Sequence, residues 1–384
     1  MMTQVYIVAA KRTPFGRFMG GLAKCSAVDL AVAAGKAVLQ DIDPAVIDQL
    51  IVGNVLSAGL GMNVARQVGV RVGVPQDRPA MTVNMVCGSG LCAVSLAAQS
   101  IRAGESQVVL CGGTESMSNA PYLLDRVRQG YRLGDGLLID SVLRDGLTDA
   151  FDRQHMGVTA ERLAEQHAIT RGVQDEFALA SQTRYAAAAK SGRLAGQIVP
   201  VLDLVADEHP RSDVTAQKLA SLKPVFGDAG SVTAGNSSGI NDGAAMLVLC
   251  GHEALSRHGW RPMAVVRGWA AVGCDPKLMG LGPIFATRRL CQRFSLALES
   301  FDTIELNEAF AAQALACMHE LRLDHQRVNR DGGAIALGHP IGASGARLAV
   351  HLAHQLRDTG LRRGLATLCV GGGLGVAIAL DACH

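Results

Sequence analysis

The chain has 384 residues, of which 49% are hydrophobic and 18% charged, and its formal net charge is +2. This length and apolar content are enough for two or three packed domains. The near-neutral charge leaves no broad basic field for nucleic acid, and apolar runs such as 264–266 are far shorter than the roughly 20 residues that span a bilayer. We therefore expect a compact globular protein that binds neither nucleic acid nor membrane.

The N-terminus and the cysteines indicate a compartment. Residues 1–8 pass directly into a β-branched apolar run, with neither a basic n-region nor an Arg/Ser-rich presequence. Ten cysteines are scattered along the chain, without a Cys-x-x-Cys pair or a Cys/His cluster at zinc-finger spacing. Reduced thiols, a cytoplasmic location and no metal site are expected. Most of the cysteines are expected to pack as small buried hydrophobes.

Taken in chain order, helical patterns rich in alanine and glycine alternate with short runs of valine, isoleucine and leucine. The apolar runs lie at 5–10, 49–53, 107–112, 263–267, 303–306 and 364–370. Such alternation predicts an α/β architecture. Glycines gather at the ends of these runs, where a strand turns into a helix or a backbone approaches a ligand.

Two segments of the chain resemble each other. Gly-Ser-Gly at 88–90 opens a helical stretch that leads to a strand ending in Cys-Gly-Gly at 111–113. Ala-Ser-Gly at 343–345 opens a similar stretch that leads to Cys369 and then to Gly-Gly at 371–372. This similarity predicts a duplicated domain whose copies pack together, with corresponding helix N-termini at one shared cleft.

The stretch between the two copies has a different pattern, with tyrosines, arginines and polar turns. We interpret it as an inserted lobe whose loops carry substrate contacts. The expected division is an N-terminal half at 1–117 plus 247–262, an inserted loop domain at 118–246 and a C-terminal half at 263–384.

The first chemical motif is the run 83–90, in which an apolar segment ends at Cys87 and small residues open a helix. A helix N-terminus stabilises a thiolate, so we expect the pKa of Cys87 to lie below the free value of about 8.5. The flanking glycines suit a tight strand-to-helix turn that exposes the side chain, as in a nucleophile elbow. Cys87 is therefore a candidate nucleophile.

The same run also matches the loose dinucleotide pattern GxGxxA. A nicotinamide-binding domain would place an acidic residue at the end of the next strand, about 20 residues on. That strand is expected to end in Cys-Gly-Gly, and Glu115 comes late. A dehydrogenase is therefore disfavoured.

Three further motifs lie in the second half. His339 stands between glycine and Pro340, on a loop just before a helix start, where it can take a thiol proton or stabilise an oxyanion. Cys369 ends an apolar strand and is followed by glycines whose N–H groups can point into a site, and a second thiol suits an acid/base role. Asn307 follows the strand at 303–306 and can orient a water or a carbonyl.

Four motifs thus follow one another in the chain: Cys-Gly-Ser-Gly, Asn-Glu-Ala-Phe, Gly-His-Pro-Ile-Gly-Ala-Ser-Gly and Cys-x-Gly-Gly-Gly. Each is weak alone, but the ordered set closely resembles the thiolase family. The resemblance runs nearly end to end, from 10–16 through 113–118 and 155–157 to 235–239. It implies a five-layered αβαβα fold of two similar halves with a loop domain, assembled as a homotetramer or homodimer.

The resemblance also implies a ping-pong reaction in which Cys87 attacks acetyl-CoA or a 3-ketoacyl-CoA and becomes acylated. His339 would activate Cys87 and, with a water held by Asn307, bind the thioester oxygen of the condensing acyl-CoA. Cys369 would exchange the proton with the α-carbon of the second acetyl group. The N–H groups of Cys87 and Gly371 would form a further oxyanion hole.

Coenzyme A and acyl-CoA enter as substrates, and no permanently bound cofactor is implied. The family pattern carries CoA contacts onto Leu147, His155, Met156, Arg211, Phe226, Ala234, Ser238, Ala309 and Phe310. Arg211 is a suitable partner for a nucleotide phosphate or the adenine face. The sequence departs from biosynthetic members at Lys218, where serine is common, and in a short segment at 200–211.

Within the family, Cys-Gly-Ser-Gly and the segment 279–283 resemble acetyl-CoA acetyltransferases, which make acetoacetyl-CoA. The segment 207–211 also resembles degradative 3-ketoacyl-CoA or 3-oxoadipyl-CoA thiolases, so the acyl chain stays open. A decarboxylating ketoacyl synthase would lack the second cysteine, Cys369. A non-catalytic acyl-CoA-binding protein would not need the intact set of Cys87, Asn307, His339 and Cys369.

Overall fold

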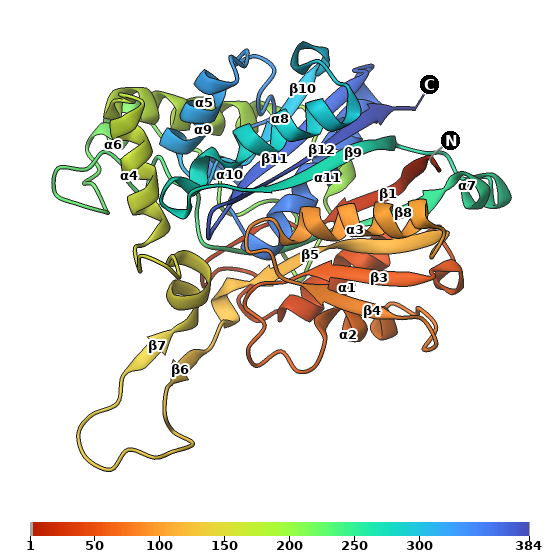
Figure 1. The fold of residues 1–384 in the computed structure, drawn as a ribbon, viewed down its shortest axis with the longest axis horizontal. Coiled ribbons are helices and arrows are strands. Elements are labelled where there is room, and N and C mark those ends of the chain that lie inside the picture. The colour runs from red at the N-terminus through yellow and green to blue at the C-terminus, as the bar shows by residue number, and fades with distance from the viewer. Residues whose placement is uncertain (1–2, 384) are drawn as a thin grey trace.

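The computed structural model describes residues 3–383, and its helices and strands stack in five layers (Figure 1). Strands form one continuous ten-stranded sheet that includes elements of both ends of the chain. Its two halves lie on opposite sides of a central pair of helices, and further helices cover the outer faces. The predicted αβαβα fold is therefore confirmed. No helix of residues 3–383 combines the length and the hydropathy that crossing a membrane requires.

The N-terminal half of the sheet contains five main strands. Their order is β1 (Val5–Arg12), β8 (Asn241–Gly251), β5 (Val108–Ser116), β3 (Gln49–Gly53) and β4 (Ala80–Val83). The strand β8 runs antiparallel to β1 and β5, whereas β3 runs parallel to β5 and β4. A short strand, β2 (Gly16–Arg17), also pairs with β8.

The C-terminal half repeats this topology. Its order is β9 (Ala264–Gly273), β12 (Leu374–Ala382), β11 (Arg363–Val370) and β10 (Thr303–Leu306). Beyond β10, a single parallel bridge between Ile304 and Val328 takes the position that β4 has beside β3 in the first half. The strand directions are also the same. The duplication that the sequence predicted is thus present in the strand order. Two residue pairs between β1 and β9 join the halves into one sheet.

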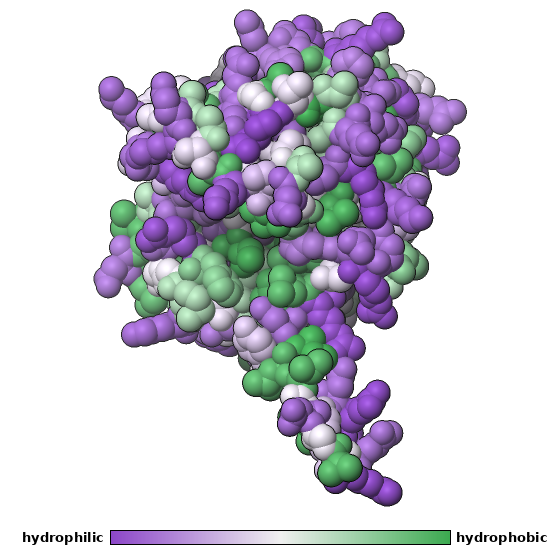
Figure 2. All heavy atoms as spheres, turned by 90° about the vertical axis from the view of Figure 1, so that its left-hand side faces the viewer, coloured by the Kyte–Doolittle hydropathy of each residue, from purple (hydrophilic) through white to green (hydrophobic). Residues whose placement is uncertain are grey.

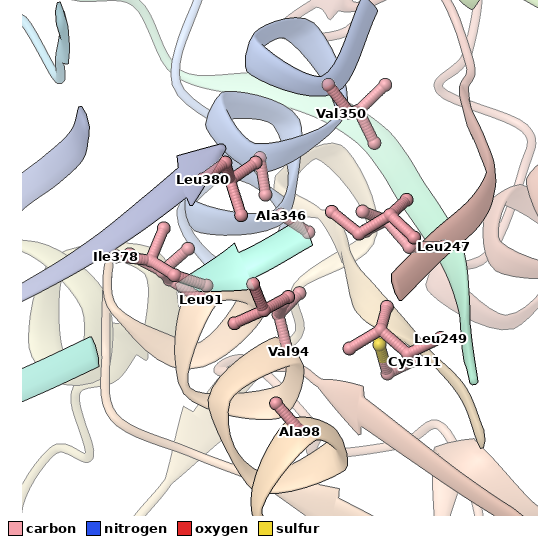
Figure 3. Close-up of a cluster of buried hydrophobic side chains, with 14 of the residues drawn as sticks. Leu91, Val94, Ala98, Cys111, Leu247, Leu249, Ala346, Val350, Ile378 and Leu380 are labelled. Carbon is pink, nitrogen blue, oxygen red and sulfur yellow. The ribbon is translucent and has the colours of Figure 1, made fainter. Parts of the chain in front are cut away.

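The helices form three layers. The central layer consists of α3 (Ser89–Ala103) and α11 (Ile341–Thr359). The outer face of the first half is covered by α1 (Ala27–Val38) and α2 (Val64–Arg71). The outer face of the second half is covered by α8 (Gly282–Phe294) and α9 (Ala311–Glu320). Figure 3 shows the central core, where Leu91 and Val94 of α3 meet Ala346 of α11 between β8 and β12. Burial of these side chains stabilises the stack, at roughly 25 cal/mol per Å² of apolar surface.

The two central helices touch through glycines at their N-terminal ends. A Cβ atom on Gly90 would lie 2.6 Å from the backbone nitrogen of Ala346, and one on Gly345 would lie 2.5 Å from that of Leu91. Glycine is therefore required at both positions, because any side chain would push the helices apart. The two Ser-Gly motifs that revealed the duplication are the contact between its copies.

The remaining elements are mostly connections and the inserted lobe. Within the lobe are β6 (Tyr122–Leu124), β7 (Leu138–Asp140), η3 (Val142–Leu147), α4 (Met156–Gln166), α5 (Arg171–Lys190), η4 (Ala195–Gln197) and α6 (Ala216–Ala220). Elsewhere are η1 (Pro44–Val46), η2 (Met117–Asn119), α7 (His252–His258), η5 (Pro276–Leu281), η6 (Leu298–Ser300) and α10 (Ala334–Leu337). The strands β6 and β7 form an arm that projects from the body (Figure 1).

The six predicted strands are present as β1, β3, β5, β9, β10 and β11, but the short strands β2, β6 and β7 and the longer β4, β8 and β12 were missed. Every residue of β8 is buried, so β8 lacks the alternation by which a half-buried strand is recognised, and the boundary placed at 246/247 falls inside it. The prediction that a strand ends at Cys-Gly-Gly was also wrong for the first copy, since β5 continues to Ser116. Gly113 therefore does not mark a strand end. Glycine is needed there because a Cβ would lie 2.1 Å from the carbonyl oxygen of Gly342.

The glycine contact between the central helices gives a stability prediction. Replacing Gly345 by alanine is expected to lower the free energy of unfolding by about 1–3 kcal/mol, because the added methyl overpacks the contact with Leu91. The matched control is Gly172→Ala in α5, where an ideal Cβ meets no described atom within 4 Å. Its effect should stay within about 0.5 kcal/mol. Urea unfolding of both variants measures the difference, and equal stabilities would contradict the packing argument.

Candidate active site

A cavity of about 280 Å³ lies between the two halves and the inserted lobe. Most of the predicted site residues line it: Cys87, Leu147, His155, Met156, Phe226, Ala234, Ser238, Ala309, Phe310, His339, Cys369 and Gly371. Three predicted residues, Asn307, Arg211 and Lys218, are outside its lining. The fold thus brings together side chains from every region of the chain at one place.

Cys87 and His339 occupy equivalent positions in the two halves. Cys87 directly precedes Gly88, the N-cap of α3, and His339 directly precedes Pro340, the N-cap of α11. Since α3 and α11 touch at their N-terminal ends, the two side chains reach the same cavity. This placement confirms the predicted shared cleft.

The turn that carries Cys87 is strained and locally hydrogen-bonded. Val86 has φ 44°, a left-handed conformation that is rare for a β-branched residue. The hydroxyl of Ser89 accepts from the N–H of Met85 (2.8 Å) and donates to the carbonyl of Val86 (2.7 Å). The N–H of Val86 donates to Asn84 Oδ1 (2.9 Å). These bonds hold the tight strand-to-helix turn that the sequence predicted, and the thiol that it carries faces the cavity.

The expectation of a lowered thiol pKa was wrong. Burial raises the pKa of Cys87 to about 11 and outweighs the N–H groups of Gly371 and of Cys87 itself, which act in the opposite direction. Cys87 lies before α3 rather than in its first turn, so the helix end does not offset the loss of water. The thiol is therefore protonated in the free protein at neutral pH.

Ser344 determines which nitrogen of His339 carries the proton. The Ser344 hydroxyl donates to the carbonyl of Pro340 (2.9 Å), so it accepts from Nδ1–H of His339 (2.5 Å). Nε2 is then left as an acceptor, and the side-chain amide of Asn307 approaches it at 3.5 Å. Burial lowers the pKa of His339 to about 3, with a smaller effect from Arg347. The ring is neutral and can accept a proton at Nε2.

Asn307 lies behind His339 rather than on the cavity surface. It is fully buried at the end of β10, and its N–H donates to the carbonyl of Thr367 (3.0 Å). Its Oδ1 has no hydrogen-bond partner among residues 3–383. Asn307 therefore contacts His339 and not the cavity, and its role of holding a water stays a prediction.

Cys369 brings a second thiol close to the first. It lies in β11, and the turn that follows has Gly372 and Gly373 at φ 81° and 82°, which only glycine adopts readily. This turn directs the N–H of Gly371 towards the sulfur of Cys87. Burial raises the pKa of Cys369 well above its ordinary value, and the nearby Cys87 adds to the rise.

Aromatic rings form one wall of the cavity. The His155 ring stacks on Phe226 with ring centroids 4.7 Å apart, and Phe226 meets Phe310 edge-on at 6.3 Å. Nδ1 of His155 accepts from the N–H of Gly157 (3.0 Å) and so caps α4, while burial lowers the pKa of His155. This wall suits an apolar chain rather than a charged group.

Arg211 and Lys218 are both exposed and lie apart from the cavity lining. The N–H of Arg211 donates to Gln182 Oε1 (3.0 Å), and Nζ of Lys218 pairs with Asp213 (2.5 Å) near α6. Any nucleotide contact through these two side chains would therefore lie outside the cavity.

No role for Glu115 was predicted from the sequence. This buried carboxylate accepts from the N–H groups of Val55 (3.1 Å), Leu56 (3.1 Å) and Gly342 (2.9 Å), and so ties the loop after β3 to the start of α11. Burial raises its pKa to about 7. A lone acidic residue inside a buried strand was the signal that could have revealed it.

The arrangement fits acyl transfer through sulfur. A neutral imidazole whose Nε2 carries no proton can take a thiol proton. Backbone N–H groups beside the sulfur can stabilise the negative charge that develops on a bound carbonyl. Cys87 lies close enough to Cys369 to raise the pKa of Cys369, and both thiols line the cavity, so both can contact one substrate.

Comparison with known proteins agrees with this geometry. The model of "Thiolase, N-terminal domain" matches residues 5–253, and that of "Thiolase, C-terminal domain" matches residues 260–382. An acetyl-CoA acetyltransferase of Escherichia coli is 49% identical over 391 residues, covering 99% of each chain. One of Chromobacterium violaceum is 48% identical over 389 residues, covering 98% of this chain and 99% of the relative.

Two solved structures are also similar. An acetyl-CoA acetyltransferase of Bacillus anthracis superposes with a TM-score of 0.97 at 44% identity, covering 100% of this chain and 99% of that one. Human mitochondrial 3-ketoacyl-CoA thiolase in complex with CoA superposes with a TM-score of 0.98 at 43% identity, covering 100% and 98%.

The raised pKa of Cys87 predicts how it reacts with iodoacetamide, which consumes the thiolate. Since burial keeps the thiol protonated, the labelling rate of Cys87 should rise about tenfold per pH unit from pH 7 through pH 9 without levelling off. In the urea-unfolded chain the rate should level off above about pH 9, because an ordinary cysteine has a pKa near 8.5. Mass spectrometry of the Cys87 peptide measures both rates. A plateau below pH 8 in the folded protein would show that the thiol is already ionised.

Proposed function

Since this chain belongs to the thiolase family of acyltransferases, we propose that it condenses two acyl-CoA molecules, or cleaves a 3-ketoacyl-CoA, through an acylated Cys87. The observation that carries this proposal is the meeting of Cys87, Cys369 and His339 in one cavity, with N–H groups aimed at the Cys87 sulfur. Neutral thiols and a neutral imidazole suit a site in which protons move only once a substrate is bound.

In the first half-reaction, Nε2 of His339 takes the Cys87 proton while the sulfur attacks the thioester carbonyl carbon. The negative charge on the carbonyl oxygen is received by the N–H groups of Cys87 and Gly371, each worth about 3 kcal/mol of barrier. The bond from the carbonyl carbon to the CoA sulfur then breaks, and His339 returns its proton to the departing CoA thiolate. The product is acyl-Cys87.

In the second half-reaction, Nε2 of His339 takes the proton of Cys369, and the resulting Cys369 thiolate takes a proton from the α-carbon of the second acetyl-CoA. The enolate oxygen is stabilised by the Nε2–H that His339 now carries and by a water that Asn307 holds, in keeping with the 3.5 Å approach of Asn307 to Nε2. The carbanion attacks the acyl carbon, a carbon–carbon bond forms, and the bond to the Cys87 sulfur breaks. The departing Cys87 thiolate takes the proton from Nε2 of His339, which restores the neutral site. Thiolysis is the reverse sequence.

Acetyl-CoA is the proposed acyl donor, with acetoacetyl-CoA as the condensation product. The names of the full-length relatives support this choice, and the narrow aromatic wall of Phe226 and Phe310 suits the pantetheine arm of CoA. The alternative is a degradative 3-ketoacyl-CoA or 3-oxoadipyl-CoA thiolase, which the similarity to the human 3-ketoacyl-CoA enzyme keeps open. Either role belongs to fatty acid or related acyl-CoA metabolism.

CoA is proposed to extend from the cavity over the inserted lobe. Its pantetheine would contact Leu147, His155, Met156, Ala234, Ser238 and Ala309 as well as the two phenylalanines, and its nucleotide would reach the exposed Arg211 and Lys218.

The proposed domain organisation remains two halves and a loop domain. The start of β8 at Asn241 supports a C-terminal limit of the loop domain near residue 240.

The proposed assembly is a homotetramer or homodimer. Large apolar side chains on the β6–β7 arm support it, since Leu133 is 98% exposed, Leu137 78% and Leu138 70%, and hydrophobic atoms gather on the projecting arm in Figure 2. A cytoplasmic location is proposed as well, and ten unpaired cysteines are consistent with it.

The separate roles of the two thiols can be tested by substitution. After incubation with acetyl-CoA, Cys87→Ala should show no acetyl adduct by mass spectrometry and should lose acyl transfer by at least ~10³-fold. Cys369→Ala should still form the adduct but fail to condense. Cys92→Ala in α3, outside the cavity lining, is the control and should retain both steps. An adduct that persists in Cys87→Ala would overturn the assignment.

The substrate class is tested by thiolysis rates. Acetoacetyl-CoA should have a kcat/KM at least about tenfold above those of 3-oxoadipyl-CoA and 3-ketohexadecanoyl-CoA, since longer chains must displace cavity walls. A preference for either longer substrate would select the degradative alternative.

A further inference from the structure

A group of side chains capable of binding a metal ion lies away from the cavity. His167 is the C-cap of α4, and His319 and Glu320 form the last turn of α9. One ring nitrogen of each histidine and one carboxylate oxygen of Glu320 lie within 4.8 Å of one another. None of the three takes part in the proposed reaction. No motif in the sequence indicates this group, because His167 is far from the other two residues in the chain.

The three side chains match the preferences of a borderline divalent cation. Two imidazoles and one carboxylate are ligands of Zn²⁺ and its first-row neighbours, at about 2.0–2.2 Å from the metal. Tetrahedral ligands then lie roughly 3.4 Å apart, so the observed spacing needs only a small closure. His167 supplies a fixed ligand, with a side chain 11% exposed, while the more exposed Glu320 and His319 can rotate towards it.

The backbone around this group also favours a cation. Two helices, α4 and α9, pack side by side and both end here, so the negative ends of their dipoles converge. Arg288 of α8 is the competing positive charge. It donates to the carbonyl of Glu320 (3.2 Å) and lies 3.9 Å from Oε2, which leaves Oε1 facing Nδ1 of His167 at 3.9 Å.

We propose that His167, His319 and Glu320 bind one divalent cation of the zinc class, with water completing its coordination. The bound cation fastens the C-terminal end of α4 to that of α9. At their other ends, about 15–17 Å away, His155 and Met156 begin α4, Ala309 and Phe310 precede α9, and these residues line the cavity. Metal binding therefore restrains two walls of the cavity from a distance.

The test uses Co²⁺ as a spectroscopic probe in equilibrium dialysis with the whole protein. Wild type should bind one equivalent per chain with the spectrum of nitrogen and oxygen ligands. His167→Ala and Glu320→Gln should each weaken binding at least ~10-fold. If the partly buried His167 is needed for folding, Glu320→Gln still tests the site. His258→Ala, an exposed histidine on α7, is the control and should bind as wild type does.

Arg288→Gln provides a test that general disruption cannot mimic. Removing the competing charge should tighten Co²⁺ binding several-fold and enlarge the rise in Tm that Zn²⁺ produces in wild type. Unchanged binding in both His167→Ala and Glu320→Gln, or a cobalt spectrum dominated by thiolate charge transfer, would overturn the proposal. These readouts require no acyl transfer, so they stand or fall independently of the proposed reaction.

Discussion

The close approach of the two central helices is the constraint on which the site depends. Gly90 and Gly345 leave no room for side chains between α3 and α11, and Gly113 and Gly342 bring the start of α11 against β5 in the same way. Because the helices meet at their N-terminal ends, whatever precedes them must also meet. In one half that residue is Cys87, and in the other it is His339, so a duplicated scaffold yields two chemically different groups at one point.

Burial then sets the protonation states of the groups that meet. It raises the pKa of Cys87 and of Cys369 and lowers that of His339, so every group is neutral in the absence of substrate. A neutral buried site costs less than an ionised one, since isolated charges lose their hydration. The glycine turn fixes the direction of the Gly371 N–H before substrate binds. This N–H stabilises the transition state most strongly when negative charge develops on a bound acyl group.

Buried ion pairs fix the parts of the molecule that surround this centre. Arg12 of β1 makes two hydrogen bonds to Asp207 of the inserted lobe (2.6 and 2.8 Å), and Tyr185 donates to the same carboxylate (3.1 Å). Arg347 of α11 pairs with Glu305 of β10 (3.2 Å), and both side chains are buried. Such pairs contribute little net stability, but removing one partner is costly, so they select one docking of the lobe and one placement of α11.

The sequence by itself determined the α/β class, six of the strands, the duplication, and the set of residues that meet around Cys87, His339 and Cys369. These follow from local periodicity and from short motifs, which neighbouring residues encode. Only the tertiary structure decided the direction of the Cys87 pKa shift, the buried position of Asn307, the full extent of β5 and β8, and the meeting of His167 with His319 and Glu320. Each depends on how far a group is removed from water, or on which distant segment lies beside it, and neither is written in the local order of residues.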